Sequence, residues 1–219
     1  MGKPRILGGA AKGAVLDTPA RGTRPSPARL REAVFDALQF RPRGRFLDLY
    51  AGSGALGLEA ASRGWEATLV ELSPAAAAVI RRNAGRARLR ATVIQADALA
   101  FAARDPGTYD VAAAAPPYPD DLLAIFRALL GAAPVAPGGL YLLQHPTGLD
   151  VAGALEPELR RLGPPSPADG GTGTRRDAPH AGVRVRRYGS NAVTWIAVPE
   201  RPAGTEAGSV PDGVSEVGC

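Results

Sequence analysis

The chain has 219 residues, of which 45% are hydrophobic and 21% charged, a composition typical of a folded globular protein and unlike that of a disordered chain. The single cysteine, Cys219, excludes an intrachain disulfide framework or thiolate metal site and favours a cytoplasmic protein, and no apolar run approaches the ~20 residues of a membrane span. The net charge is +5, with ten basic and three acidic residues within residues 1–45, which is typical of a segment that binds nucleic acid.

This basic segment opens the chain. Residues 1–28 are expected to form an N-terminal extension, with a small β-hairpin over Arg5–Thr23. Arginine suits bidentate contacts to phosphate, so we expect RNA to be bound by Arg5, Arg24, Arg29 and Arg31. The alternatives are an ordinary solvated arginine face and an arginine-rich composition without functional meaning.

Residues 29–198 alternate between segments typical of strands and of helices. The apolar period of about 3.6 residues in Leu30–Leu38 predicts an amphipathic helix. Further helices are predicted over Leu56–Ser62, Pro74–Arg86 and Asp121–Leu130, and strands over Arg45–Tyr50, Thr68–Glu71, Ala91–Gln95, Tyr109–Ala115, Gly139–Gln144, Val183–Tyr188 and Val193–Val198. This order predicts an α/β Rossmann-like domain: a mainly parallel sheet of seven strands, helices on both faces and an antiparallel C-terminal pair. A ligand should then lie at the carboxyl ends of the strands.

Two stretches rich in proline and glycine are not part of this alternation. We expect residues 163–182 to form a long surface loop and residues 199–219 a disordered tail. His145 and His180 lie in turn-like surroundings, so we expect both to be exposed and without a catalytic role.

A glycine-rich turn, Ala51-Gly52-Ser53-Gly54, follows the first predicted strand. Glycines at 52, 54 and 57 let a strand turn sharply into a helix, and they let the backbone approach a ligand that a Cβ would block. The spacing G-x-G-x-x-G is shared with dinucleotide enzymes, so alone it is weak evidence. The neighbouring residues must decide which ligand the turn holds.

Acidic residues end three successive predicted strands. Asp48 precedes the glycine turn, as in methyltransferases, where this carboxylate faces the amino-acid part of a sulfonium cofactor. Glu71 is placed to bind both ribose hydroxyls and Asp97 to reach the adenine amino group. The three acids favour S-adenosylmethionine over the alternative of helix caps and solvated strand ends. We expect the cofactor to contact Asp48, Tyr50, Ala51, Gly52, Ser53, Gly54, Glu71, Leu72, Asp97 and Ala98.

The fourth predicted strand ends in Ala115-Pro116-Pro117-Tyr118. This resembles the (Asp/Asn)-Pro-Pro-(Tyr/Phe) signature of methyltransferases that modify exocyclic or amide nitrogens, except that alanine takes the acidic position. An exocyclic amine is a poor nucleophile, so its N–H groups need hydrogen-bond acceptors. In the signature these acceptors are the acid side chain and the backbone carbonyl of the next residue, and the aromatic ring stacks on the base. We expect all four residues to form the catalytic motif. Asp120 and Asp121 should begin a helix and point elsewhere.

Further segments resemble the RsmD family, bacterial methyltransferases that modify the N2 amine of a guanine in small-subunit ribosomal RNA. The matching segments are Arg5–Gly9 with Lys12-Gly13, Thr23–Phe35, Leu47–Glu59, Pro116–Tyr118 and Arg187–Gly189. The resemblance covers residues from about 4 to 198 and omits the 163–182 loop. It implies a class I methyltransferase fold, S-adenosylmethionine as cofactor, no metal, and 16S ribosomal RNA or an assembling small subunit as partner of a monomeric, cytoplasmic protein.

Ala115 leaves alternatives open. The chain is an altered or inactivated form of an active enzyme, or another residue supplies the missing acceptor. A second hypothesis is a non-catalytic ribosome-assembly factor that keeps the cofactor pocket. A third is an enzyme of the Asp-Pro-Pro-Tyr type that acts on adenine N6 or on a protein glutamine, and the N-terminal resemblance argues against it.

Overall fold

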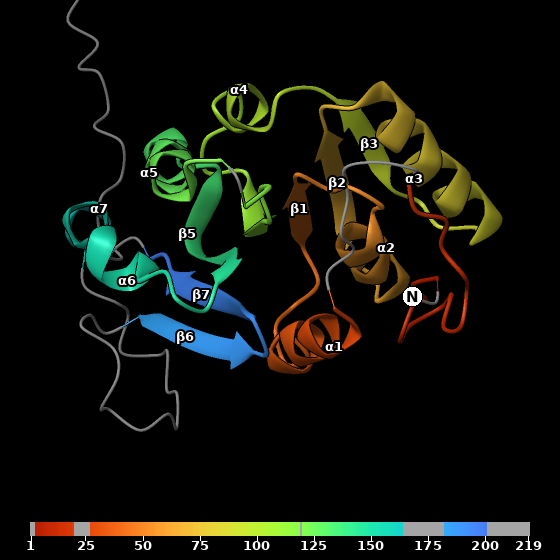
Figure 1. Ribbon diagram of the computed structural model, residues 1–219, viewed down its shortest axis with the longest axis horizontal. Helices are drawn as coiled ribbons and strands as arrows, with labels where there is room; N and C mark the ends of the chain where they lie inside the picture. Colours follow the sequence, from red (N-terminus) through yellow and green to blue (C-terminus); the bar gives the residue numbers. More distant parts are fainter. Residues whose placement is uncertain (1–2, 20–26, 119, 164–181, 201–219) are drawn as a thin grey trace, which may run out of the picture.

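The computed structural model describes residues 3–19, 27–118, 120–163 and 182–200. Figure 1 shows a twisted central sheet with helices on either side. The strands are β1 (Arg45–Leu49), β2 (Glu66–Glu71), β3 (Thr92–Gln95), β4 (Tyr109–Ala114), β5 (Val135–Pro146), β6 (Val183–Tyr188) and β7 (Asn191–Ala197). The helices are α1 (Ala28–Ala37), α2 (Ala55–Ser62), α3 (Pro74–Arg86), α4 (Ala98–Ala102), α5 (Leu122–Ala132), α6 (Val151–Ala154) and α7 (Glu156–Leu162).

The seven strands form one sheet in the order β3-β2-β1-β4-β5-β7-β6. The first five strands along the chain are parallel, while β7 pairs antiparallel with both β5 and β6. This confirms the predicted Rossmann-like sheet and its antiparallel C-terminal pair. The strand order reverses between β1 and β4, and a ligand cleft is expected at the carboxyl ends of the strands beside such a reversal.

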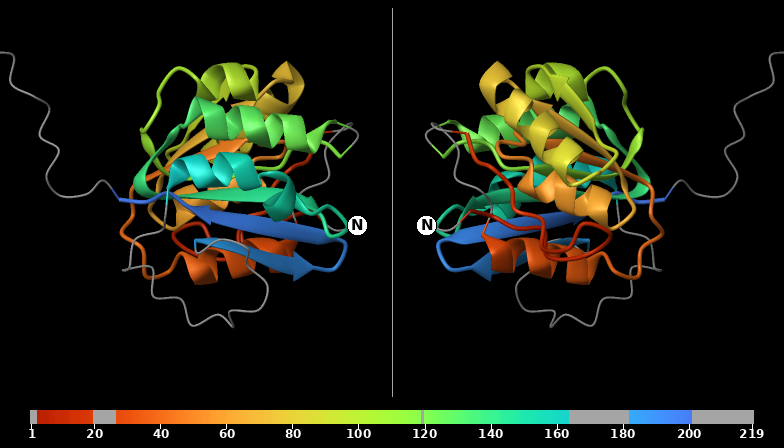
Figure 2. Two further views of the ribbon diagram at one scale, coloured as in Figure 1. Left: turned by 90° about the vertical axis from the view of Figure 1, so that its left-hand side faces the viewer. Right: turned by 90° about the vertical axis from the view of Figure 1, so that its right-hand side faces the viewer.

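Two hydrophobic clusters cover the two faces of the sheet. One face packs against α1, α2 and α3, through residues such as Leu30, Leu58 and Ile80. The opposite face packs against α4 to α7, through residues such as Phe126 and Leu155. Figure 2 shows these helix layers edge-on, with the sheet between them. The central strands β1 and β4 are therefore buried on both faces, as their apolar sequences require.

Short polar residues begin several helices. Ser73 accepts a hydrogen bond from the backbone N–H of Ala76 and is followed by Pro74, as predicted for the start of α3. Asp121 caps α5 through the N–H of Ala124, which confirms that its side chain points into the helix start. Helices α4, α6 and α7 were not predicted because they have seven residues or fewer and too few turns to show a periodic apolar face.

The N-terminal segment, residues 3–19, is packed into the domain. Arg5 and Val15 form an antiparallel bridge, and Ile6 donates to the carbonyl of Ala14 over 3.0 Å, so the two arms pair as a small hairpin. Ile6 is 1% exposed and Leu16 is fully buried, both in the cluster under α1 to α3. The segment thus contributes to the core and is not a detached extension.

Several predictions lie outside the described residues. These are the RNA-binding assignment of Arg24, the exposure of His180, the body of the 163–182 loop and the tail from residue 201. Among the described residues, no helix is long and apolar enough to span a membrane. No group of three metal-ligating side chains occurs in that same part of the chain.

Candidate cofactor and catalytic site

The glycine turn lies where β1 passes into α2. Gly52 and Gly54 have φ angles of 57° and 77°, in the left-handed region that glycine adopts without strain. Gly57 serves packing, because a Cβ there would lie 2.5 Å from Cγ of Leu69. Of the turn residues, Gly52 is partly exposed while Ala51, Ser53 and Gly54 are buried, so a ligand would meet this turn chiefly through its backbone.

Tyr50 directly follows β1, which ends one residue earlier than predicted. Its φ is 61°, a value rare for a residue with a bulky side chain and typical of functional sites. Burial, with the charges of Asp97 and Asp120, raises the pKa of Tyr50 to about 12. The phenol therefore stays neutral and lies near both carboxylates, at the mouth of the predicted site.

Asp48 is buried beside the glycine turn. It is 3% exposed, and its Oδ2 accepts a hydrogen bond from the N–H of Gly57 over 2.8 Å. Burial raises the pKa of its carboxyl to about 7, although the Gly57 bond opposes the shift, and the charge of Glu71 raises it further. Asp48 thus joins β1 to α2, and its proximity to Glu71 places two carboxyls at one end of the sheet.

Glu71, at the end of β2, binds backbone on both sides of the predicted site. Oε2 accepts from the N–H of Gly52 and Oε1 from that of Ser73, each over 2.8 Å. A carboxylate has about four acceptor positions, so both oxygens can still accept hydroxyl donors. The next residue, Leu72, is 67% exposed and offers an apolar surface beside the carboxylate.

Asp97 follows β3 and caps α4. Its Oδ1 accepts from the N–H of Ala100 over 2.8 Å, and the residue is exposed. One carboxylate oxygen of Asp97 therefore acts as a helix cap, which was the alternative to a cofactor contact. Ala98, also expected at the cofactor, is 4% exposed and packs in the core under α4, so only its backbone is placed to meet a ligand.

The tetrapeptide Ala115–Tyr118 lies directly after β4. The N–H of Ala115 donates to the carbonyl of Leu49 over 3.4 Å, which places position 115 beside the end of β1. Pro116 is buried, Pro117 is exposed and Tyr118 is 42% exposed. The motif therefore lies at the same edge of the sheet as the three acids, as predicted.

Sequence reasoning missed two amides near this motif. The Tyr118 hydroxyl donates to Oδ1 of Asn191, the first residue of β7. Nε2 of Gln144, near the end of β5, donates to the same oxygen over 3.4 Å. Strands β5 and β7 are remote from the motif in sequence, and no local pattern marks either amide.

Asn83 was also missed. This α3 side chain is 1% exposed; its Nδ2 donates to the carbonyls of Asp17 and Ser53, and its Oδ1 accepts from the N–H of Asp17. It therefore ties the N-terminal segment to the glycine turn. A lone asparagine within an alanine-rich helix gave no signal for this role.

The exposure expected for His145 was wrong. The side chain is 1% exposed, with Nδ1 2.9 Å from the carbonyl of Pro146 and Nε2 2.8 Å from Oγ1 of Thr194. Because a carbonyl only accepts, Nδ1 carries the hydrogen and Nε2 accepts from the threonine. Burial lowers the pKa of this imidazole, so His145 is a neutral structural residue.

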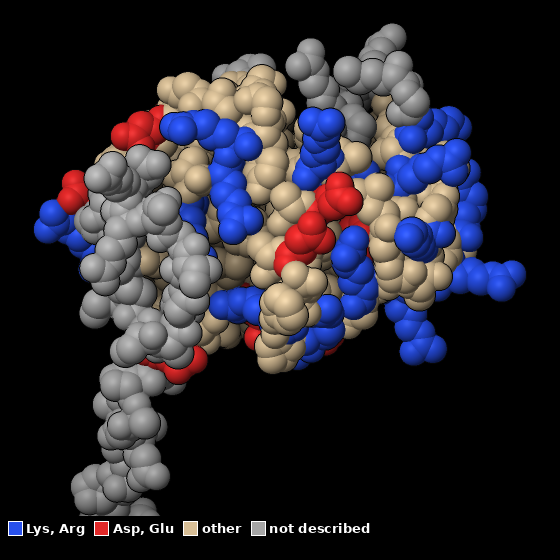
Figure 3. Space-filling view, turned by 90° about the horizontal axis from the view of Figure 1, so that it is seen from below, with Lys and Arg blue, Asp and Glu red and all other residues tan. Residues whose placement is uncertain are grey.

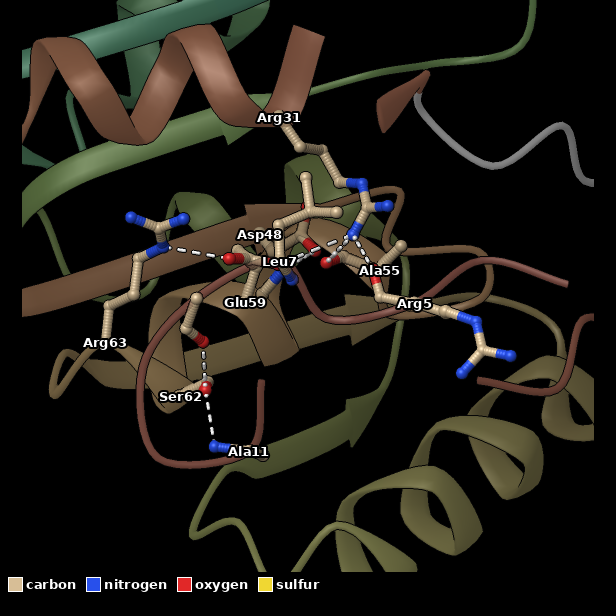
Figure 4. A network of polar contacts seen from close by, with 11 residues as sticks. Arg5, Leu7, Ala11, Arg31, Asp48, Ala55, Glu59, Ser62 and Arg63 are labelled. Atoms are coloured by element: carbon tan, nitrogen blue, oxygen red, sulfur yellow. Dashed lines mark hydrogen bonds and ion pairs between the residues drawn. The ribbon is translucent and has the colours of Figure 1, made fainter. Parts of the chain in front are cut away.

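Arg31 requires a correction. It was expected to face RNA, but it is 1% exposed, and Figure 4 shows its side chain pointing into a network beneath α1. One guanidinium nitrogen lies 3.6 Å from Oε2 of Glu59 and donates to the carbonyls of Arg5 and Ala55. Glu59 also pairs with Arg63 over 2.8 Å and accepts from the N–H of Leu7. Arg31 therefore holds the N-terminal segment to α1 and α2 and has no surface for RNA.

The other described arginines of the RNA assignment are exposed. Arg29 lies in the first turn of α1, and Arg5 is exposed while donating to the carbonyl of Gly13. Figure 3 views the molecule from the side of α1 and β6 and shows Lys and Arg spread over this face, with Asp and Glu in few places. This face can attract a polyanion.

Comparison with known proteins identifies relatives of this chain. The family model described as Conserved hypothetical protein 95 matches residues 4–156. The chain is 37% identical over 130 residues to ribosomal RNA small subunit methyltransferase D of Escherichia coli strain K12, in an alignment that covers 56% of this chain and 64% of that protein. The chain thus matches just under two thirds of that relative.

Solved structures with the same fold were also found. A hypothetical protein of Thermus thermophilus matches with a TM-score of 0.70 and 42% identity, covering 89% of this chain and 99% of that one. The T. thermophilus 16S rRNA N2 G1207 methyltransferase RsmC, in complex with AdoMet and guanosine, matches with a TM-score of 0.61 and 22% identity over 83% of this chain and 44% of that one. The second likeness shows the fold alone.

Proposed function

This chain belongs to the Conserved hypothetical protein 95 family, the family of the RsmD methyltransferases, and from that premise we propose that it is an S-adenosylmethionine-dependent methyltransferase of small-subunit ribosomal RNA. The observation that carries the proposal is the meeting of two groups at one edge of the sheet. Asp48 near the end of β1, Glu71 at the end of β2 and Asp97 after β3 lie at the edge of the sheet that carries the glycine turn, and the Pro-Pro-Tyr motif follows β4, which is adjacent to β1.

The described residues fit an adenosine cofactor. Glu71 anchors the glycine turn and keeps acceptor capacity for ribose hydroxyls. Exposed Leu72 offers an apolar surface on which an adenine ring can pack, and Asp97 can accept from the adenine amine. Gly52 lets the backbone come close to the amino-acid part, and Asp48 lies behind it as a buried acid.

The proposed reaction is methylation of a guanine N2 amine. When bound, S-adenosylmethionine supplies an electrophilic methyl group: the N2 lone pair forms the new N–C bond, the C–S electron pair returns to sulfur, and an amine proton leaves to solvent. The chain's own task is to hold the base. In this proposal Tyr118, whose hydroxyl donates to Asn191, stacks on the base, and the carbonyl of Pro116 accepts one N–H. Positioning of this kind supplies much of the rate in such transfers.

The RNA partner is proposed from charge and family together. We propose that 16S ribosomal RNA, or the small subunit during its assembly, meets the basic face that carries α1, and that the chain acts as a monomer in the cytoplasm, where ribosomes assemble. Exposed Arg29 and Arg5 are the described contacts of that proposal. Arg31 is withdrawn from it because it is buried.

Methyl transfer to authentic substrate tests the proposed function. Small ribosomal subunits from a strain that lacks this chain would be incubated with the protein and S-adenosylmethionine carrying a labelled methyl group. Mass spectrometry is expected to find the label as N2-methylguanine at one site of the small-subunit RNA. Label on adenine would favour the adenine N6 alternative, and a chain that binds cofactor and subunits but transfers no label would be the assembly factor.

Position 115 provides a sharper test of the catalytic motif. An aspartate there would add a preorganised acceptor for a guanine N–H, so Ala115→Asp is expected to raise single-turnover methyl transfer by about 10²–10³-fold without much change in cofactor affinity. Ala115→Asn should give part of the gain through its carbonyl oxygen. Equal rates for the native chain and the aspartate variant would contradict our placement of the motif.

A further inference from the structure

A small pocket lies between α1 and the sheet, at the point where β4 ends. Aliphatic side chains of α1 and α2 form one wall, and β4, β5 and β7 form the other. Ala115 belongs to this lining, in the position that an acid occupies in the Asp-Pro-Pro-Tyr signature. Among the described lining residues, Gln144 alone has a polar side chain.

Strand register places Gln144 on the same side of the sheet as Ala115. In the β4·β5 ladder Ala113 pairs with Leu142, and side chains two residues apart along a strand share a face. Gln144 and Ala115 therefore both face α1. Gln144 pairs with Val193 across β5 and β7, and Val193 lies in the core cluster of that face. The amide of Gln144 thus enters an otherwise apolar pocket whose lining includes the alanine.

Asn191 is a hydrogen-bond partner of the Gln144 amide. Nε2 of Gln144 donates to Oδ1 of Asn191 over 3.4 Å, and the Tyr118 hydroxyl donates to the same oxygen. With its nitrogen directed to Asn191, Gln144 turns its carbonyl oxygen away from that residue. Asn191 therefore links the aromatic residue of the motif to the amide beside Ala115.

We propose that Gln144 supplies the hydrogen-bond acceptor for the guanine 2-amino group that Ala115 lacks, and that Asn191 is a positioning residue for it. This inference rests on the proposed function, because it names the residue that recognises the base at the same site. A carboxamide oxygen accepts a hydrogen bond but does not take the proton. Gln144 thus orients the amine and selects guanine, while the proton still leaves to solvent.

Equilibrium binding of nucleosides tests the inference without methyl transfer. Guanosine and inosine differ by the 2-amino group, and their dissociation constants would be measured on protein saturated with S-adenosylhomocysteine. The native chain should prefer guanosine by roughly three- to tenfold, the range for one neutral hydrogen bond. Gln144→Met and Gln144→Ala should lose the preference, whereas Gln144→Glu, which keeps an acceptor, should retain it. Gln39→Leu, at an exposed glutamine after α1, is the control and should match the native chain.

Two apolar variants, Gln144→Met and Gln144→Ala, are used in case one of them fails to fold. Unchanged binding of S-adenosylhomocysteine verifies that each variant is folded. The inference is overturned if the native chain binds both nucleosides equally or if the apolar variants keep the preference. Transfer assays provide a second readout: Gln144→Met should slow methylation on the order of 10²-fold, and Ala115→Asp in that background should restore most of it. A native chain that prefers guanosine yet methylates no ribosomal RNA would instead refute the proposed function and leave the base contact standing.

Discussion

Asp48 is a residue whose burial has a measurable consequence for stability. Burial raises the pKa of its carboxyl from 3.8 to about 7, so the folded chain holds this proton more tightly than the unfolded chain does. The contribution to stability is present below pH ~4 and is lost as the pH rises through ~7. Relative to Asp48→Asn, which cannot ionise, the native chain should lose roughly 1–4 kcal/mol of unfolding free energy across this window.

Urea unfolding of both proteins at several pH values between about 4 and about 8 would measure this difference. Asparagine keeps an oxygen for the N–H of Gly57, so the comparison isolates the titration from the hydrogen bond. Parallel stability profiles for the two proteins would mean that Asp48 is ionised in the fold throughout.

Glu71 has a dual role that a substitution series can separate. We expect Glu71→Ala to weaken S-adenosylmethionine binding by about 1–3 kcal/mol, the range for leaving charged hydrogen-bond partners unpaired. Glu71→Gln keeps one carbonyl oxygen but cannot accept from both Gly52 and Ser73. The affinity of this variant for S-adenosylmethionine should therefore lie between the affinities of the native chain and of Glu71→Ala. Isothermal titration calorimetry would give the three affinities, and equal values would remove Glu71 from the cofactor site.

At the scale of elements, the parts that repeat a pattern could be predicted from the sequence. The strands β1 to β4 and the helices α2 and α3 follow from apolar runs and turn residues, and their order determines the sheet. The carboxylates at three strand ends follow in turn, because parallel strands bring their carboxyl ends to one edge. Each of these inferences uses neighbours in sequence.

Arg31 marks the limit of that reasoning. Its position in a basic segment suggested a surface role, yet its partners come from the N-terminal segment and α2. A buried arginine and an exposed one differ by the helix face on which they lie, and α1 presents Arg31 inward with Leu30 and Val34. Gln144 and Asn191 were missed for a related reason, since the sheet alone brings their strands to the Ala115–Tyr118 motif.

The network beneath α1 is expected to be important for stability. Arg31→Met would leave the Glu59 carboxylate, which is fully buried, with Arg63 as its remaining cation. Breaking one partner of a buried ion pair costs about 3–5 kcal/mol, and we expect the lower end because Arg63 stays. Arg29→Met, two residues earlier on the exposed face, is the matched control and should change unfolding free energy by less than about 0.5 kcal/mol. Chemical unfolding would measure the unfolding free energies of the native chain and the two variants. Similar losses of unfolding free energy for Arg31→Met and Arg29→Met would contradict a structural role of Arg31.

At the scale of the whole molecule, the charged side chains are unevenly distributed. Asp48, Glu71 and Asp97 lie at or near the strand ends beside the glycine turn, while Lys and Arg are spread over the face that carries α1, among uncharged residues and a few acidic ones (Figure 3). Helix α1 lies between the pocket and the basic face. Its residues Leu30 and Val34 line the pocket beside Ala115, and Arg29 is exposed in its first turn. An RNA bound across the basic face would therefore have its phosphates near Arg29 while a base enters toward Ala115 and Gln144.

This arrangement predicts that RNA affinity can be reduced without affecting the cofactor. Arg29→Glu should weaken binding of a 16S RNA fragment several-fold and lower the slope of log affinity against log salt by about 0.7–0.9 for each phosphate that the protein no longer neutralises. Arg104→Glu makes the same charge change at an exposed residue after α4, on the other side of the sheet from α1, and should have a much smaller effect. Filter binding at several salt concentrations would give the slopes, and calorimetry would verify unchanged S-adenosylmethionine affinity. If Arg29→Glu weakened the cofactor as strongly as the RNA, the residue would belong to the cofactor site, and the basic face would need another contact to the ribosomal RNA.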